Sequence, residues 1–366
     1  MLKRILWILI SVFVLCGCTS KNVPEEITFS SWGSVSEVKI IKDVISNFEQ
    51  ENPDIKVKFI HIPQNYFQKI HLLFASNTAP DVIFINNLYL PIYASKLENL
   101  SDVVSKKEFY SQAIDGLSYN GALLAAPRDI SDLVFYVNKD ALKKFGIDVP
   151  NENWTLSDLL DVSKQVSGMY AVSYEPDIYW VLPYLAYYGG GVLAPDGTNI
   201  IASDGSIEGL NYYRNLKKNG YAPSAAQVGS STLAQMFLDG RVVFYLSGRW
   251  MYPKISEKAN FDWGVVNFPY GKAPMPCDSS GWAISKTSKH KDSAYRFVQY
   301  LSSKKCIDEF TSTGLIVPAR VDSAQSLNKD FRNEKVFLNV IKKSKNTPVN
   351  KDYKRIVDDI NNDLQL

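Results

Sequence analysis

The sequence is poor in the residues that usually bind metals or form disulfide networks. Its 366 residues include only 3 His and 4 Cys, which argues against a His-rich metal site and against a disulfide scaffold. It also lacks an excess of one charge, because 40 Lys and Arg stand against 38 Asp and Glu, a net charge of +2. A chain this close to neutral lacks the basic surface of nucleic-acid-binding proteins, so we expect no nucleic acid partner.

The common catalytic motifs are absent as well. No GxSxG, P-loop, GxGxxG or HExxH pattern occurs, and His61, His71 and His290 do not have the spacing of metal ligands. Two carboxylates could serve a glycosidase, but no spacing singles out a pair among the many. We therefore expect a protein that is not an enzyme, with no catalytic residue, metal or other cofactor. A glycosidase remains the alternative.

The first 26 residues have the pattern of an export signal. Lys3 and Arg4 precede an apolar run over residues 5–15, which is too short for a bilayer span of roughly 20 residues. The following Leu15-Cys16-Gly17-Cys18 resembles the lipobox of bacterial lipoproteins. This resemblance implies a signal peptide over 1–17, lipidation of Cys18, a tether over 18–26, and a folded domain held outside the cytoplasm by a lipid anchor. The alternative is an ordinary secretory signal. Of the remaining cysteines, Cys277 and Cys306 could pair, but we favour two buried thiols.

Strand and helix patterns alternate along the rest of the chain, and its length suggests about two domains. Apolar strands at 27–32, 55–62 and 81–85 enclose amphipathic helices at 36–51 and 66–75, an order that favours a mainly parallel sheet. A second set begins with a strand at 133–138 and continues with a capping box at Thr155–Asp158 and strands at 169–174, 242–246 and 282–285. The fold class is therefore α/β with two lobes, and ligands bind such sheets at the carboxyl ends of the strands.

Seven segments in register carry a resemblance to a known family over nearly the whole chain. They are ITFSSWGS (27–34), FEQENPDIKVKFI (48–60), FASNTAPDVIFI (74–85), LVFYVNKDALKKFGIDVP with NWTLSDLL (133–160), FLDGRVVFYLSGRW (237–250), GWAISKTSKHKDSAYRFVQYL (281–301) and GLIVPAR (314–320). The chain resembles the bacterial extracellular solute-binding proteins of family 1, the carbohydrate receptors of ABC importers. It departs from the pattern at Asn86-Asn87 and at Arg128-Asp129-Ile130, so the fold carries over better than the ligand.

The resemblance implies a type II periplasmic-binding-protein-like fold with a hinged cleft between the lobes. We expect an N-terminal lobe of 25–130 plus 285–317 and a C-terminal lobe of 131–284 plus 318–366. The crossings would lie near 128–133, 278–285 and 314–321. It implies a monomer that binds a small carbohydrate and delivers it to the transmembrane permease subunits. The alternatives are another solute, such as a polyol, a glycerol phosphate, a peptide or ferric iron, and a sensor subunit.

A sugar offers apolar ring faces and a rim of hydroxyls, so its site needs aromatic platforms together with directional donors and acceptors. Candidates are aromatic, charged, amide and glycine residues at predicted strand ends and crossings, although each could instead belong to the core, a turn or a hinge ion pair. They are Trp32, Gly33, Asn86, Asn87, Tyr89, Arg128, Asp129, Tyr179, Trp180, Gly248, Arg249, Trp250, Gly281, Trp282 and Arg320. The adjacent pairs Tyr187-Tyr188 and Tyr212-Tyr213 are the candidates for ferric iron, but packing is the favoured interpretation.

Overall fold

The computed structural model describes residues 23–326 and 333–365. The predicted signal peptide (1–17), the predicted lipidation site Cys18 and the first residues of the predicted tether lie outside the described residues. Among the described helices, none is long and apolar enough to cross a membrane.

The first lobe is built on a seven-stranded sheet in the order β12-β6-β11-β3-β1-β2, with β13 beside β11. Strands β2 and β3 run parallel to β1, whereas β11 runs antiparallel to both β3 and β6. The strands are β1 (Glu25–Ser31), β2 (Ile55–His61), β3 (Val82–Asn86), β6 (Ala126–Asp132), β11 (Met275–Ile284), β12 (Val317–Pro318) and β13 (Ser344–Asn346). A separate hairpin joins β4 (Ser118–Tyr119) to β5 (Ala122–Leu123).

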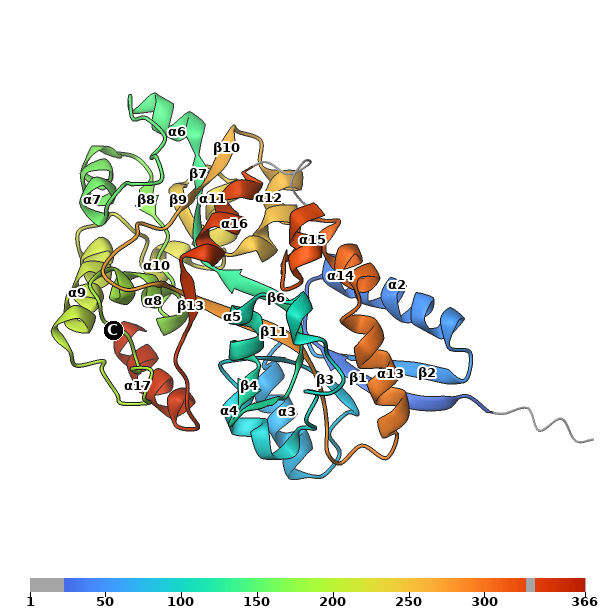
Figure 1. Cartoon of the computed structure of the whole chain (residues 1–366). Coiled ribbons are helices and arrows are strands. Elements are labelled where there is room, and N and C mark those ends of the chain that lie inside the picture. The colour runs from blue at the N-terminus through green and yellow to red at the C-terminus, as the bar shows by residue number, and fades with distance from the viewer. Residues whose placement is uncertain (1–22, 327–332, 366) are drawn as a thin grey trace, which may run out of the picture.

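Helices cover both faces of this sheet (Figure 1). Figure 1 shows α2, α13 and α14 on one side and α3 and α4 on the other. In the first layer, Phe29 of β1 meets Phe297 of α13 at a centroid distance of 5.4 Å. The helices are α2 (Val35–Glu51), α3 (Tyr66–Ala75), α4 (Leu90–Tyr93), α5 (Ser111–Gly116), α13 (Lys291–Leu301), α14 (Lys304–Thr311) and α15 (Val321–Ser326), with short 3-10 turns η1 (Ala94–Lys96) and η2 (Lys106–Glu108).

The second lobe holds a four-stranded sheet in the order β10-β7-β9-β8. Its strands are β7 (Val134–Asn138), β8 (Tyr170–Val172), β9 (Val242–Ser247) and β10 (Trp263–Asn267). Its helices are α6 (Lys139–Lys144), α7 (Leu156–Gln165), α8 (Ile178–Tyr187), α9 (Asp204–Lys218), α10 (Ala225–Val228), α11 (Leu233–Leu238), α12 (Tyr252–Lys258), α16 (Glu334–Lys342) and α17 (Tyr353–Gln365), with the 3-10 turn η3 (Arg249–Met251). The predicted capping box at Thr155 and Asp158 is present at the start of α7.

The chain passes between the sheets at Leu133, between β6 and β7, and again over residues 268–274, between β10 and β11. After β13 of the first sheet, the chain passes to the second lobe, where α17 packs on α8. The predicted division assigns residues 275–284 to the C-terminal lobe, but in the structure they form β11 near the middle of the first sheet. The sequence pattern shows only the end of this strand, because Asp278 interrupts its apolar residues.

Cys277 and Cys306 are free, buried thiols, as favoured from the sequence. Burial raises the pKa of both thiols, so they are poor nucleophiles. Because both are buried, neither cysteine belongs to a surface-exposed reactive site.

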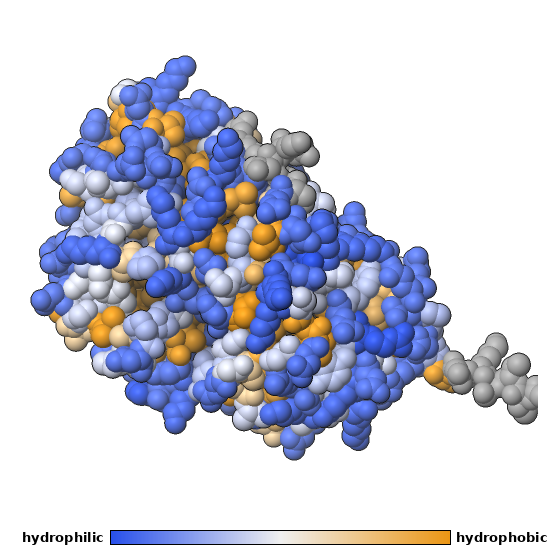
Figure 2. All heavy atoms as spheres, in the orientation of Figure 1, coloured by the Kyte–Doolittle hydropathy of each residue, from blue (hydrophilic) through white to orange (hydrophobic). Residues whose placement is uncertain are grey.

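Hydrophilic residues cover most of the face seen in Figure 2, with hydrophobic residues scattered between them.

Candidate functional site

A cavity of about 390 Å³ lies between the two lobes, and both lobes contribute to its lining. The first lobe supplies residues from the carboxyl ends of β1 and β3, from β6 and β11, and from the approach to β12. The second lobe supplies α8 and η3. The lining residues are Trp32, Glu37, Asn86, Leu88, Arg128, Asp129, Ile130, Ser131, Tyr179, Trp180, Arg249, Trp250, Asp278, Ser280, Leu315, Ile316 and Val317.

Arg128 of β6 is held in a buried cluster of charges on the first-lobe side. Its guanidinium forms ion pairs with Glu37 of α2 and with the neighbouring Asp129, both at 2.6 Å. It also lies over the Phe84 ring, 4.2 Å from the centroid. Because two carboxylates and an aromatic face surround it, the cation is already satisfied by the protein.

Arg249 is the corresponding cation of the second lobe, directly after β9. Its Nε donates a hydrogen bond of 2.9 Å to the carbonyl oxygen of Gly314, and its Nη1 pairs with Glu334 of α16 at 2.5 Å. Both charged side chains are almost fully buried. Arg249 thus connects the end of β9 to the loop before β12 and to α16, in addition to lining the cavity.

Trp32 forms the aromatic wall of the first lobe. It follows β1 and packs edge-on against Phe84 at 4.6 Å, Tyr66 at 5.0 Å and Phe67 at 5.3 Å between ring centroids. These contacts fix the orientation of the indole, so that the part of it that reaches the cavity is presented rigidly.

The second lobe supplies three further aromatic rings. Tyr179 and Trp180 begin α8, and the Tyr179 and Trp250 rings lie 6.4 Å apart. Asp177 caps α8 by accepting a hydrogen bond of 2.8 Å from the Tyr179 backbone N–H. Asn361 of α17 donates a hydrogen bond of 3.0 Å to Asp177, so the C-terminal helix supports the position of these rings.

Two of the lining residues, Asp129 and Asp278, have a carboxylate oxygen without a partner among the residues described. Oδ1 of Asp129 and Oδ1 of Asp278 are buried and have no hydrogen-bond partner within the described chain. Burial raises the pKa of Asp278 to about 7, while the Tyr179 hydroxyl beside it acts in the opposite direction. Burial also raises the pKa of Asp129, against the effect of Arg128. Buried polar atoms without partners are costly, and a hydroxylated ligand could satisfy both.

The structure brings eight of the predicted site residues to this cavity: Trp32, Asn86, Arg128, Asp129, Tyr179, Trp180, Arg249 and Trp250. They meet there because they stand at the ends of β1, β3 and β9, within β6 and at the start of α8. Trp180 additionally has a buried indole N–H without a partner. The cavity therefore contains aromatic faces, donors and acceptors together.

Three predicted glycines support the site without lining it. A Cβ on Gly33, whose φ is +136°, would lie 2.8 Å from the Glu37 carboxylate, and one on Gly248 would lie 1.9 Å from the Trp250 ring. A Cβ on Gly281 would meet the Ala126 carbonyl oxygen at 2.1 Å, where the register of β11 against β6 shifts. The first two glycines thus make room for side chains that line the cavity.

The other predicted residues lie elsewhere. Asn87 ties the end of β3 to β11, since its side-chain oxygen accepts a hydrogen bond of 3.0 Å from the Ser279 N–H. Tyr89 stacks on Phe67 at 3.6 Å between ring centroids. Trp282 is 1% exposed and belongs to the core of the first lobe.

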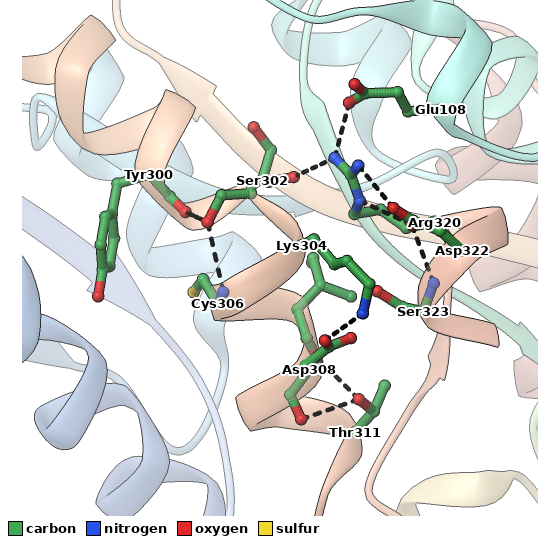
Figure 3. A network of polar contacts seen from close by, with 12 residues as sticks. Glu108, Tyr300, Ser302, Lys304, Cys306, Asp308, Thr311, Arg320, Asp322 and Ser323 are labelled. Atoms are coloured by element: carbon green, nitrogen blue, oxygen red, sulfur yellow. Dashed lines mark hydrogen bonds and ion pairs between the residues drawn. The ribbon is translucent and has the colours of Figure 1, made fainter. Parts of the chain in front are cut away.

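Arg320 belongs to a separate polar network beside β12 (Figure 3). Its guanidinium pairs with Glu108 at 2.7 Å and with Asp322 at 3.0 Å, and it donates a hydrogen bond of 3.2 Å to the Ser302 carbonyl oxygen. These bonds join α15, α13 and η2. Arg320 therefore holds parts of the first lobe together, away from the cavity.

Sequence reasoning missed nine lining residues, although most of them lie in the segments predicted as lobe crossings. Ile130 and Ser131 fall in 128–133, Asp278 and Ser280 in 278–285, and residues 315–317 in 314–321. Glu37 and Leu88 carry no such signal. Glu37 reaches the site only because α2 begins beside the end of β1.

The tyrosine pairs considered for ferric iron are used in packing. The Tyr212 hydroxyl donates to the Leu156 carbonyl oxygen and that of Tyr213 to the Glu175 carbonyl oxygen, both at 2.7 Å. Tyr187 and Tyr188 pack edge to face at 5.2 Å. Within residues 23–326 and 333–365, no group of three or more His, Cys, Asp or Glu side chains is arranged to hold a metal ion.

Comparison with known proteins identifies the same fold and one family. A model described as bacterial extracellular solute-binding protein matches residues 43–337. The maltodextrin-binding protein MdxE of Bacillus subtilis (strain 168) is 26% identical over an alignment of 381 positions, gaps included, which covers 91% of this chain and 84% of that protein. A maltooligosaccharide ABC transporter solute-binding lipoprotein of Streptococcus pneumoniae (strain ATCC BAA-255 / R6) is 26% identical over 251 residues, 62% of this chain and 56% of that one.

A solved structure has the same two-lobed arrangement. An ABC substrate-binding protein from Listeria monocytogenes, in complex with cycloalternan, superposes with a TM-score of 0.87. The match covers 94% of this chain and 93% of that chain at 24% sequence identity. At this identity the likeness shows the fold alone. The cavity between the lobes is established by the residues of this chain that line it.

Proposed function

Because the chain belongs to the family of bacterial extracellular solute-binding proteins, we propose that it is the substrate-binding component of an ABC importer and captures a mono- or oligosaccharide in the cavity between its lobes. A membrane permease then receives the sugar, and the partner ATPase supplies the energy. The relatives named above, which bind maltodextrin or belong to a maltooligosaccharide transporter, support a sugar as the solute.

The observation that carries this proposal is the composition of the cavity. Trp32 on one lobe faces the same space as Tyr179, Trp180 and Trp250 on the other. Asp129 and Asp278 line the same cavity, and each has one buried carboxylate oxygen without a hydrogen-bond partner in the described part of the chain. Aromatic rings suit the apolar faces of a sugar and the carboxylate oxygens suit its hydroxyls, so one pyranose ring could use both kinds of contact at once. The volume of about 390 Å³ is within the usual size range of small-molecule sites.

A thermal-shift screen of the folded domain against a library of neutral mono- and oligosaccharides tests the proposal. A sugar that binds only the folded state raises the melting temperature in proportion to the logarithm of its concentration. We expect at least one sugar to do so and to be recovered unchanged. Release of new reducing ends would identify a glycosidase instead, and a library without any stabilising sugar would overturn the proposal.

Replacing Trp250 by alanine should weaken binding of that sugar by about 1–3 kcal/mol, because a ring face loses its aromatic platform. Stability should change little, since Trp250 is 37% exposed. Isothermal titration of the variant measures the affinity. Tyr119→Ala, on the β4–β5 hairpin and outside the lining, is the matched control and should bind like the parent chain. A lower melting temperature with unchanged affinity would assign Trp250 to the core.

We also propose that the domain is anchored to the outside of the membrane through a lipid on Cys18. The lipobox-like Leu15-Cys16-Gly17-Cys18 supports this, as does the lipoprotein named among the relatives. Cys18→Ala should move the protein from the membrane fraction to the soluble fraction, as measured by immunoblotting of fractionated cells. Cys16→Ala is the control, because it leaves the acylated residue in place and should remain in the membrane fraction. Unchanged membrane attachment of Cys18→Ala would refute the anchor.

A further inference from the structure

We propose that the cavity selects its solute by charge, accepting neutral and ammonium-bearing saccharides and rejecting acidic ones, and that Asp278 is the residue that sets this preference. The inference rests on the proposed function and narrows its substrate class. It follows from the distribution of charge around the cavity.

Of the lining residues, only Arg128 and Arg249 carry a positive charge. Arg128 is paired with Glu37 and Asp129 at 2.6 Å each, and Arg249 with Glu334 at 2.5 Å. Arg249 also donates to the Gly314 carbonyl oxygen. A phosphate or carboxylate group on a solute would have to displace these buried carboxylates to reach either guanidinium.

Three carboxylates line the cavity, namely Glu37, Asp129 and Asp278. Glu37 and Asp129 share one guanidinium, and Asp278 has no ion pair among the described residues. Asp132 lies close by on β6, opposite Cys277 in the pairing with β11, and both its carboxylate oxygens are buried without a partner. Acidic groups therefore exceed basic ones around the solute.

An acidic sugar would lose its hydration beside Asp278 and gain no cation in return, which is a strong penalty in a buried site. An ammonium group could instead pair with the Asp278 carboxylate, one oxygen of which has no partner in the described chain, and lie against Tyr179, Trp180 or Trp250, whose ring faces attract cations. A neutral sugar meets neither effect and uses the same oxygen as a hydroxyl acceptor.

The experiment compares matched solutes at pH 7.5, above the pKa of about 7 to which burial raises the Asp278 carboxyl. The solutes are glucose, galactose and mannose, their 2-amino forms, and their uronic acids, together with maltose and cellobiose as neutral disaccharides. Isothermal titration gives the dissociation constant of each. For any scaffold that binds, we expect the uronic acid to bind at least tenfold more weakly than the neutral form, and the amino form to bind at least as tightly. Asp278→Asn should reduce the ratio of the uronate and amino-sugar dissociation constants by about tenfold.

Asp43→Asn provides the matched control, since it removes one carboxylate from an exposed position of α2 and should leave that ratio unchanged. If a uronic acid binds as tightly as its neutral parent, the charge preference is wrong while sugar binding stands. If the ratio survives in Asp278→Asn, another residue sets the preference and the assignment to Asp278 fails. If no sugar of any charge binds, the proposed function and the inference fall together. Because the comparison is a ratio within one variant, a loss of stability in Asp278→Asn does not obscure it.

Discussion

Replacing Arg128 by alanine should lower the free energy of unfolding by about 3–5 kcal/mol, the cost typical of leaving a buried charge without its partner. Arg128 is 6% exposed, and Glu37 and Asp129 both depend on it. Its loss would leave two carboxylates in a space from which water is largely excluded. Urea denaturation followed by circular dichroism measures the change.

Arg296→Ala is the control for this substitution. Arg296 pairs with Asp54 at 2.6 Å, as Arg128 does with its partners, but this pair lies on the surface, where water screens both charges. The control should therefore unfold at nearly the same urea concentration as the parent chain. Adding Glu37→Gln and Asp129→Asn to an Arg128→Met variant should recover part of the loss, because the stranded charges are then gone. Equal unfolding midpoints for Arg128→Ala and the parent would contradict the buried cluster.

Replacing Trp282 by alanine should destabilise the chain by about 3–5 kcal/mol through the cavity that it leaves in the core. Trp282 is 1% exposed and packs beside Phe310 at 5.8 Å between ring centroids. Since it does not line the cavity between the lobes, the affinity of the remaining folded protein for its solute should hardly change. Urea denaturation gives the first quantity, and titration below the unfolding transition gives the second.

Trp250→Ala reverses this pattern, so the two tryptophans control for each other. The variant at 250 should lose affinity and keep its stability, whereas the variant at 282 should lose stability and keep its affinity. A marked loss of affinity in Trp282→Ala, without a change in unfolding, would mean that Trp282 contacts the solute after all.

These two tryptophans show what the sequence can and cannot predict about the site. Both follow a glycine next to an apolar strand, Gly248 with Arg249 before Trp250 and Gly281 directly before Trp282. Trp250 comes after the end of β9, where it lines the cavity, whereas Trp282 lies within β11 and packs beside Phe310 of α14. Next to Trp282, the pairing of β11 with β6 shifts so that Arg128 has no paired residue in β11, which is a bulge in β6. A bulge of this kind leaves no periodic signal in the sequence.

The same contrast holds for the fold. Helix α3 has the bounds predicted from its apolar spacing, 66–75, and β2 has buried Ile55 and Val57 alternating with exposed Lys56 and Lys58, as expected. Strand β6 and the first part of β11 carry charged residues at buried positions, so an apolar pattern does not reveal them. Glu37 compensates the buried charge of Arg128, yet it lies 91 residues away along the chain. Only the folded chain brings the two together.

The position of β11 in the first sheet has a consequence for biosynthesis. This strand lies between β6 and β3, yet it follows the whole four-stranded sheet of the second lobe along the chain. Until residue 284 has left the ribosome, β3 and β6 have no common neighbour, and their facing edges offer unpaired N–H and C=O groups. The amino-terminal half therefore cannot complete its own sheet as it is translated. Completion of the first sheet therefore comes late in synthesis, after every strand of the second sheet has been made.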